Sequence, residues 1–185
     1  EGVALPERHL GLVTARESVI NQQPWQAFAA TLEQTLDIDA LLTLSQSTNL
    51  PAGEWPALPA ADAGAGLTLA IADDEAFNFY YPDNITLLER TGLNIVRFSP
   101  LHDTCLPDCQ MIWLGGGYPE LHAAALARNV SMLNQLREAH QRGVAIYAEC
   151  GGLMYLGSSL EDSNGDTWLM ADIIPGHSKM GKRLT

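Results

Sequence analysis

The sequence predicts an α/β fold in which a parallel sheet is covered by helices on both faces. Several short runs are continuously apolar and alternate with segments of helical periodicity, which is the pattern of parallel strands buried on both sides. One such run, 144–148, ends just before Cys150 and two glycines. Ligand sites in parallel sheets lie at the carboxyl ends of the strands. We therefore expect the functional site at this edge of the sheet.

The chain divides into three parts by composition and periodicity. Residues 1–50 are expected to be mainly helical, 51–66 to form a linker, and 67–185 to form the domain that contains the sheet. The linker is rich in proline, alanine and glycine and has no periodicity. The chain starts at Glu1 instead of methionine and stops without a terminal element. We therefore expect a fragment of a longer protein.

The first part is predicted to hold a loop, a short apolar strand and two helices. The strand is expected within the first 13 residues. Residues 24–36 have helical spacing of apolar positions, with proline at a permitted first turn. A second helix is predicted at 38–44, and Asp37 or Asp39 is expected to cap it.

The third part alternates strands and helices. Four segments rich in apolar residues are predicted to be parallel strands: 67–72, 94–99, 110–114 and 144–148. Its predicted helices run from 82 or 83 to 92, over 119–143, and onward from the residue after Cys150. A further strand or edge segment is expected at 168–174.

Composition narrows the class of protein. The chain has 185 residues, enough for one sizeable α/β domain and a smaller appendage, and 46% of them are hydrophobic. A net charge of −12 argues against a nucleic-acid partner, because phosphates need a basic surface. The sequence shows neither a signal peptide nor an apolar run of membrane-spanning length, so we expect no membrane association. Three cysteines form no even set, which favours a reduced, cytoplasmic protein, and Cys105 and Cys109 lack the second ligand pair of a zinc site.

The segment around Cys150 is typical of a nucleophile elbow. A strand stops, the cysteine follows, Gly151 and Gly152 come next, and a helical pattern begins at once. Such a turn holds a side chain above the sheet edge, among backbone amides and a helix N-terminus that favour the thiolate. The glycines at 115–117 would let backbone amides approach a ligand opposite the thiol. With the Gly151 amide, they would suit an oxyanion in acyl transfer.

These motifs resemble one family. GGGYPEL at 115–121 and AECGGLMY at 148–155 are similar to the glutamine amidotransferase domain of the cobyrinic acid a,c-diamide synthase family. IADDEAFNFYYPDN at 71–84 resembles the entry strand and helix of that domain, and PERHLGL at 6–12 resembles the end of the family's ATP-binding synthetase domain. The resemblance covers nearly the whole chain. It implies a class I amidotransferase-like, flavodoxin-like fold, with 1–50 as a remnant of the synthetase domain.

The resemblance also implies an activity, that of a glutamine-hydrolysing carbon–nitrogen ligase of cobalamin biosynthesis. The family amidates the a- and c-carboxylates of cobyrinic acid with ammonia from glutamine, using ATP and magnesium in the synthetase domain. It implies Cys150 as nucleophile and Gly117 and Gly151 as oxyanion donors. Gly115, Gly116 and Tyr118 are expected to contact glutamine, and no resident metal is expected. A homodimer is one assembly that we consider.

Two catalytic parts of the family are missing from the sequence. The family's base is a histidine near its C-terminus, and His177 lies in a context unlike that motif. The phosphate-binding loop GxxxxGK[ST] does not occur. We therefore expect the chain alone to have little or no glutaminase activity. Arg8 and His9 are assigned either to contacts with ATP or the corrin carboxylates or to a surface contact between domains.

Other interpretations stay open. Cobyric acid synthase, or an enzyme that amidates hydrogenobyrinic acid or nickel sirohydrochlorin, would share this domain, and a docking or regulatory domain could share the fold. The acidic run 73–75 is assigned to a solvated loop or a helix start instead of a metal site. The aromatic run 79–81 is assigned to the core and a domain interface. His102, His122 and His140 are expected at the surface.

Overall fold

The computed structural model describes residues 7–8, 11–12, 22–46 and 57–181. The chain forms two compact units, Glu1–Ala57 and Leu58–Thr185. In the smaller unit, β1 (Glu7–Arg8) pairs antiparallel with β2 (Gly11–Leu12). The two predicted helices are confirmed as α1 (Gln22–Thr35) and α2 (Ile38–Ser45). Asp37 caps α2, because its side chain accepts a hydrogen bond from the Ala40 amide at 2.9 Å.

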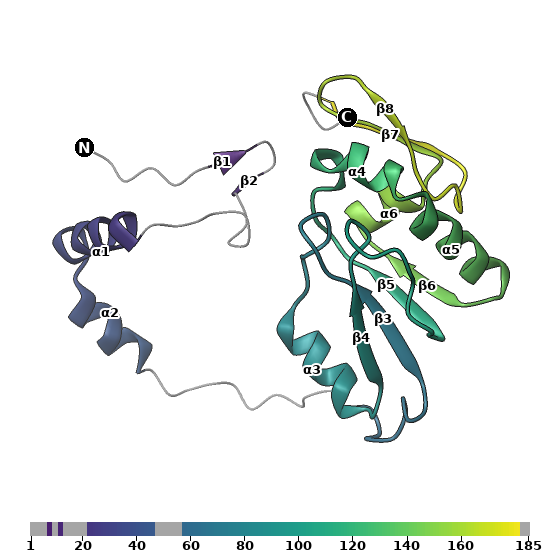
Figure 1. The fold of residues 1–185 in the computed structure, drawn as a ribbon. Coiled ribbons are helices and arrows are strands. Elements are labelled where there is room, and N and C mark those ends of the chain that lie inside the picture. Colours follow the sequence, from purple (N-terminus) through teal and green to yellow (C-terminus); the bar gives the residue numbers. More distant parts are fainter. Residues whose placement is uncertain (1–6, 9–10, 13–21, 47–56, 182–185) are drawn as a thin grey trace. The chain divides into compact units, whose positions relative to one another are not determined.

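The larger unit contains the predicted parallel sheet (Figure 1). Its strands follow the order β4-β3-β5-β6, and all three pairings are parallel. They are β3 (Thr68–Ala72), β4 (Asn94–Phe98), β5 (Met111–Leu114) and β6 (Ala145–Ala148). The prediction of four parallel strands is therefore confirmed.

Helices cover the two faces of this sheet unequally. One face packs against α4 (Ala123–Arg128), α5 (Val130–Gln141) and α6 (Gly151–Leu156). The other face packs against α3 (Pro82–Arg90), which buries Ile85 against Leu69, Ile71 and Trp113. Figure 1 shows α3 on its own side of the strands, opposite α5 and α6. The predicted two-sided covering is confirmed, although α3 reaches only part of its face.

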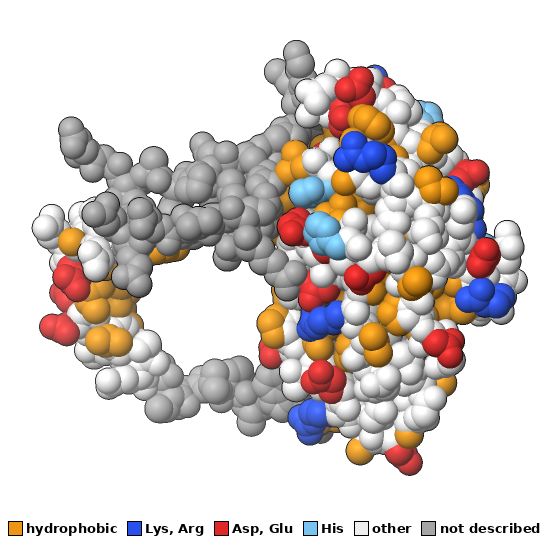
Figure 2. Space-filling model, in the orientation of Figure 1, with side chains coloured by type: hydrophobic (Ala, Val, Ile, Leu, Met, Phe, Trp, Pro, Cys, Tyr) orange, Lys and Arg blue, Asp and Glu red, His pale blue; other side chains and the backbone are white. Residues whose placement is uncertain are grey.

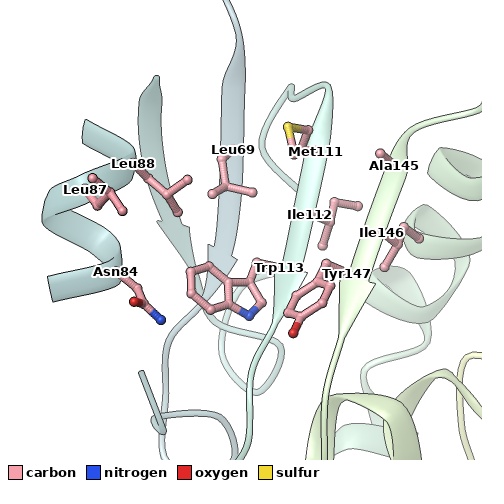
Figure 3. Close-up of a pocket in the computed structure, with 10 residues that line it drawn as sticks. All are labelled: Leu69, Asn84, Leu87, Leu88, Met111, Ile112, Trp113, Ala145, Ile146 and Tyr147. Carbon is pink, nitrogen blue, oxygen red and sulfur yellow. The ribbon is translucent and has the colours of Figure 1, made fainter. Parts of the chain in front are cut away.

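A cavity of about 430 Å³ occupies the rest of that face, between α3 and strands β3, β5 and β6 (Figure 3). Its lining is almost entirely apolar, with the Trp113 ring at its centre and Tyr147 beside it. Among the residues that the structure describes, its lining contains neither a cysteine nor a charged side chain.

The prediction of one helix over 119–143 is wrong. The segment forms a 3-10 turn, η1 (Pro119–Leu121), followed by α4 and α5 as separate helices. Asn129 separates the last two, since its side-chain oxygen caps α5 at Met132 and its amide donates to the carbonyls of Pro100 and Asp103, both at 2.8 Å. These hydrogen bonds to a distant loop are therefore favoured over a single uninterrupted helix.

A second, three-stranded sheet follows α6 in the order β8-β7-β9. It consists of β7 (Ser159–Glu161), β8 (Thr167–Leu169) and β9 (His177–Lys179). The strand expected at 168–174 is therefore confirmed only at its start and belongs to this sheet. Arg137 of α5 anchors the segment after β8 by donating to the carbonyls of Met170 and Ala171.

The surface agrees with the composition. Acidic and basic side chains are interspersed on the described face of the larger unit shown in Figure 2, without a broad basic area. Among the described residues, no helix is long and apolar enough to cross a membrane.

Candidate active site

Cys150 sits at the sharp turn between β6 and α6. Its backbone has φ 49° and ψ −115°, a conformation that residues with a side chain rarely adopt. The side chain is exposed. The turn therefore presents the thiol at the carboxyl edge of the sheet, as predicted for an elbow.

The two glycines after Cys150 are required by close packing. A Cβ atom on Gly152 would lie 2.1 Å from the Leu114 carbonyl oxygen, and one on Gly151 would lie 2.7 Å from Pro119 Cδ. Real Cβ contacts essentially never fall below 3.0 Å. Only glycine lets α6 begin this close to the end of β5.

The glycine loop 115–117 packs against the loop between β3 and α3. A Cβ on Gly117 would lie 2.0 Å from the Ala76 carbonyl oxygen. The Gly116 carbonyl accepts hydrogen bonds from the amides of Asn78 and Phe79, both at 3.1 Å. The glycines thus allow two loops at the carboxyl edge to interlock.

The glycine loop also contacts the elbow directly. The Gly152 amide donates to the Gly115 carbonyl at 3.0 Å, and a Cβ on Gly116 would lie 3.6 Å from the Cβ of Cys150. Within the described part of the chain, the amides of Gly117 and Gly151 donate no hydrogen bond. The structure thus leaves two backbone donors unused close to the cysteine. An oxyanion site needs such donors.

The three acidic residues of the β3–α3 loop have separate partners. Asp73 pairs with Arg97, and Glu75 pairs with His102 at 2.9 Å. Backbone and His102 hydrogen bonds lower the pKa of Glu75 below its ordinary value. Asp74 is only 5% exposed and accepts from backbone amides, so the assignment of 73–75 to a solvated loop or a helix start is wrong at this residue. Among the residues that the structure describes, no group of three ligand-type side chains could hold a metal.

Glu149 joins the elbow to the cavity on the sheet face. Its carboxylate accepts a hydrogen bond from Trp113 Nε1 at 3.2 Å and one from the Tyr147 hydroxyl at 3.5 Å. Both rings line the cavity (Figure 3). The residue just before the nucleophile candidate is therefore held by the core of the sheet.

The structure places the remaining candidates as follows. Tyr118 is buried and its amide donates to the Ala76 carbonyl at 3.0 Å. His177 begins β9, and no hydrogen bond joins it to Cys150 among the described residues. Arg8 lies in β1, and His9 falls outside the described residues. His122 is half-buried and its Nε2 atom is buried without a described partner, so the surface assignment of this histidine holds only in part.

Two residues that organise the site were missed by the sequence interpretation. Asp74 folds the β3–α3 loop, and its signal was present, because an aspartate commonly bonds the amide two residues on. Tyr80 places its hydroxyl between β3 and the glycine loop. No local pattern distinguishes this tyrosine from its aromatic neighbours.

Comparison with known proteins gives consistent matches. Residues 68–185 match the family model of the CobB/CobQ-like glutamine amidotransferase domain. The cobyrinate a,c-diamide synthase of Salmonella typhimurium is 78% identical over 185 residues, which cover 100% of this chain and 40% of that protein. Those of Listeria innocua and Dehalococcoides mccartyi are each 44% identical, over 98% of this chain and 40% of theirs. The chain thus spans about 40% of the length of these relatives.

Proposed function

Because the chain belongs to the CobB/CobQ-like glutamine amidotransferase family, we propose that its larger unit hydrolyses glutamine with Cys150 as the nucleophile. The observation that carries this proposal is the strained backbone of Cys150, which holds an exposed thiol beside the glycine loop. Strain of this kind concentrates at functional sites. A docking domain on the same fold has no use for a cysteine in this conformation.

The proposed reaction starts when the Cys150 thiolate attacks the carboxamide carbon of the glutamine side chain. A C–S bond forms and the carbonyl electrons move to oxygen, where the amides of Gly117 and Gly151 are the proposed donors. The C–N bond then breaks, and the nitrogen takes up a proton and leaves as ammonia. Water hydrolyses the remaining thioester, which releases glutamate and restores the thiol. Gly115 and Gly116, together with Tyr118, are proposed to line the bound glutamine.

The proposed general base is a histidine outside the described residues. This follows the family resemblance and is supported by the absence, among the described residues, of a histidine hydrogen-bonded to Cys150. The base would take the thiol proton and pass it to the departing nitrogen. Because the sequence lacks the family's histidine motif, we expect the 185-residue chain alone to show little glutaminase activity.

For the full-length protein we propose the activity named for its relatives. Ammonia would pass to a synthetase domain and amidate the a- and c-carboxylates of cobyrinic acid, with ATP and magnesium bound there. The residues described here do not fit ATP and magnesium, because the sequence lacks a phosphate-binding loop and the described side chains form no metal site. No step proposed for this chain passes through them. A homodimer and a cytoplasmic location stay predictions.

A glutaminase assay tests the nucleophile. In the full-length protein, Cys150→Ser should abolish release of glutamate from glutamine, whereas Cys105→Ser should leave it unchanged. Cys105 is the matched control, since it is also an exposed cysteine. Hydrolysis that persists in the Cys150→Ser protein would contradict the assignment.

A substrate panel tests the tetrapyrrole. With ATP, magnesium and glutamine, cobyrinic acid should gain two amides. If only hydrogenobyrinic acid or only nickel sirohydrochlorin were amidated, the cobyrinic acid assignment would be wrong and that compound would be the substrate. Amidation of the later carboxylates would favour the cobyric acid synthase alternative.

A further inference from the structure

The hydroxyl of Tyr80 lies between the last residue of β3 and the first residue of the glycine loop. It donates to the Ala72 carbonyl and accepts from the Gly115 amide at 2.9 Å. The ring stacks edge-on against Trp113, with centroids 5.1 Å apart. Burial raises the pKa of Tyr80 above its ordinary value, so the hydroxyl keeps the proton that it donates.

The register of the sheet shows what this hydroxyl replaces. The Leu114 carbonyl accepts a hydrogen bond from the segment after β6, so the next residue, Gly115, turns its amide toward β3. The Asp73 amide donates to β4, so Ala72 turns its carbonyl toward β5. In a continuous parallel ladder the Gly115 amide would donate directly to Ala72. The pairing of β3 with β5 ends at Ile71 and Trp113. The Tyr80 hydroxyl instead bonds both the Ala72 carbonyl and the Gly115 amide.

Gly115 passes this arrangement on to the elbow. Its carbonyl accepts from the Gly152 amide in the first turn of α6 at 3.0 Å. A Cβ on Gly115 would lie 2.5 Å from the Tyr80 ring, so the ring and the loop are in close contact. A chain of hydrogen bonds therefore runs from β3 through Tyr80 and Gly115 to α6.

We propose that Tyr80 is a positioning residue for glutamine hydrolysis, which separates β5 from β3 and so places the Gly117 amide beside Cys150. The inference rests on the proposed function. Without the hydroxyl, the Gly115 amide either loses its acceptor or moves to bond Ala72 directly. Both outcomes displace the glycine loop from the thiol. The substrate carbonyl would still be attacked, but the oxyanion would be held less well.

Tyr80→Phe in the full-length protein tests this role. Loss of one oxyanion donor costs about 100-fold to 1,000-fold in kcat, and a displaced donor should cost less, about 10-fold to 100-fold. We expect kcat for glutamine hydrolysis to fall by that factor and KM to stay within about twofold, because an interaction made only in the transition state is lost. Alkylation of Cys150 by iodoacetamide forms no oxyanion, so its rate should stay within about twofold of the wild-type rate.

The matched control is Tyr155→Phe. Tyr155 is also buried, and its hydroxyl has no hydrogen-bond partner among the described residues. This variant should keep the wild-type kcat. An unchanged kcat in Tyr80→Phe would overturn the proposal, and so would a parallel fall in the alkylation rate, which would indicate general disorder of the elbow.

Failure of the proposed function is distinguishable from failure of this inference. If the wild-type protein hydrolyses no glutamine, the function is wrong, and amide hydrogen exchange then tests the positioning role. Tyr80→Phe should accelerate exchange at the Gly115 amide about tenfold or more, and an unchanged rate there would overturn the role. If Tyr80→Phe does not fold, the wild-type Gly115 amide is decisive: strong protection is expected, and free exchange contradicts the inference.

Discussion

Asp74→Asn is the substitution that most directly tests how the candidate site is built. One carboxylate oxygen of Asp74 accepts from the amides of Ala76 (2.8 Å) and Phe77 (3.1 Å). The other accepts from the Ser99 hydroxyl (2.8 Å) and the Leu101 amide (2.9 Å). Asparagine keeps one oxygen and places an NH₂ group against the second pair of donors. The change therefore sets a donor against the Leu101 amide without altering the shape of the side chain.

The magnitude follows from these four bonds. A buried donor left without an acceptor costs about 1–3 kcal/mol, and the Leu101 amide becomes such a donor. The Ser99 hydroxyl can turn and accept from the new NH₂, so its loss is small. The two remaining bonds change from charged to neutral acceptors, at about 0.5–1 kcal/mol each. We expect a total near 3 kcal/mol, a large share of the roughly 5–15 kcal/mol that stabilises a typical domain.

Urea unfolding of the chain, followed by circular dichroism, measures this loss. The midpoint should fall while the slope of free energy against urea stays constant, since the surface exposed on unfolding is the same. Glu75→Gln is the matched control. It also removes a carboxylate charge, at the next residue along the chain, but the Glu75 side chain is 47% exposed. Exposed ion pairs contribute about 1 kcal/mol or less. A loss below about 1 kcal/mol for Asp74→Asn, or one equal to the control, would refute the reasoning.

Two further predictions concern the same edge of the sheet. Gly152→Ala should destabilise the larger unit by about 3 kcal/mol and abolish glutamine hydrolysis in the full-length protein, because its Cβ would meet the Leu114 oxygen at 2.1 Å. Gly157→Ala at the other end of α6 meets its nearest atom, the Gly176 oxygen, at 3.2 Å and should cost less; equal effects on unfolding would contradict this packing argument. Backbone hydrogen bonds and then the pair with His102 lower the pKa of Glu75, so these contacts stabilise the fold above the ordinary pKa of 4.5, and the contribution is lost as pH falls through the lowered value. The difference in urea midpoint between Glu75→Gln and wild type should therefore be full at pH 6 and shrink as pH falls below 4.5, and a difference that does not change with pH would count against this contribution.

The sequence was sufficient for the elements whose signal is local. The four strands of the parallel sheet are short and rich in apolar residues, although β4 also holds Asn94 and Arg97, and the turn at Cys150 follows from its two glycines. The break at Asn129 was not predictable, because it depends on carbonyls of a loop distant in sequence. Strands β7 and β9 were missed because each has only three residues, and β9 pairs in parallel with β7 from beyond β8 in the sequence.

In the candidate site, too, residues with a local sequence signal were predicted and residues that depend on tertiary packing were not. Cys150 and the glycines can be recognised from residue type and spacing, so the placement of a thiol beside a glycine loop could be predicted. Asp74 and Tyr80 are polar residues whose importance comes from burial between loops, and burial of a polar side chain is decided by tertiary packing. The predicted roles of Gly117 and Gly151 still await experiment.

The backbone conformation at Cys150 lowers the stability of the larger unit, although the proposed chemistry depends on it. A left-handed conformation in a residue with a side chain costs about 1–3 kcal/mol, and glycine adopts it without that cost. Cys150→Gly should therefore yield a protein that is inactive yet more resistant to unfolding than Cys150→Ser. Cys150 therefore stands at a position where the backbone alone would favour glycine.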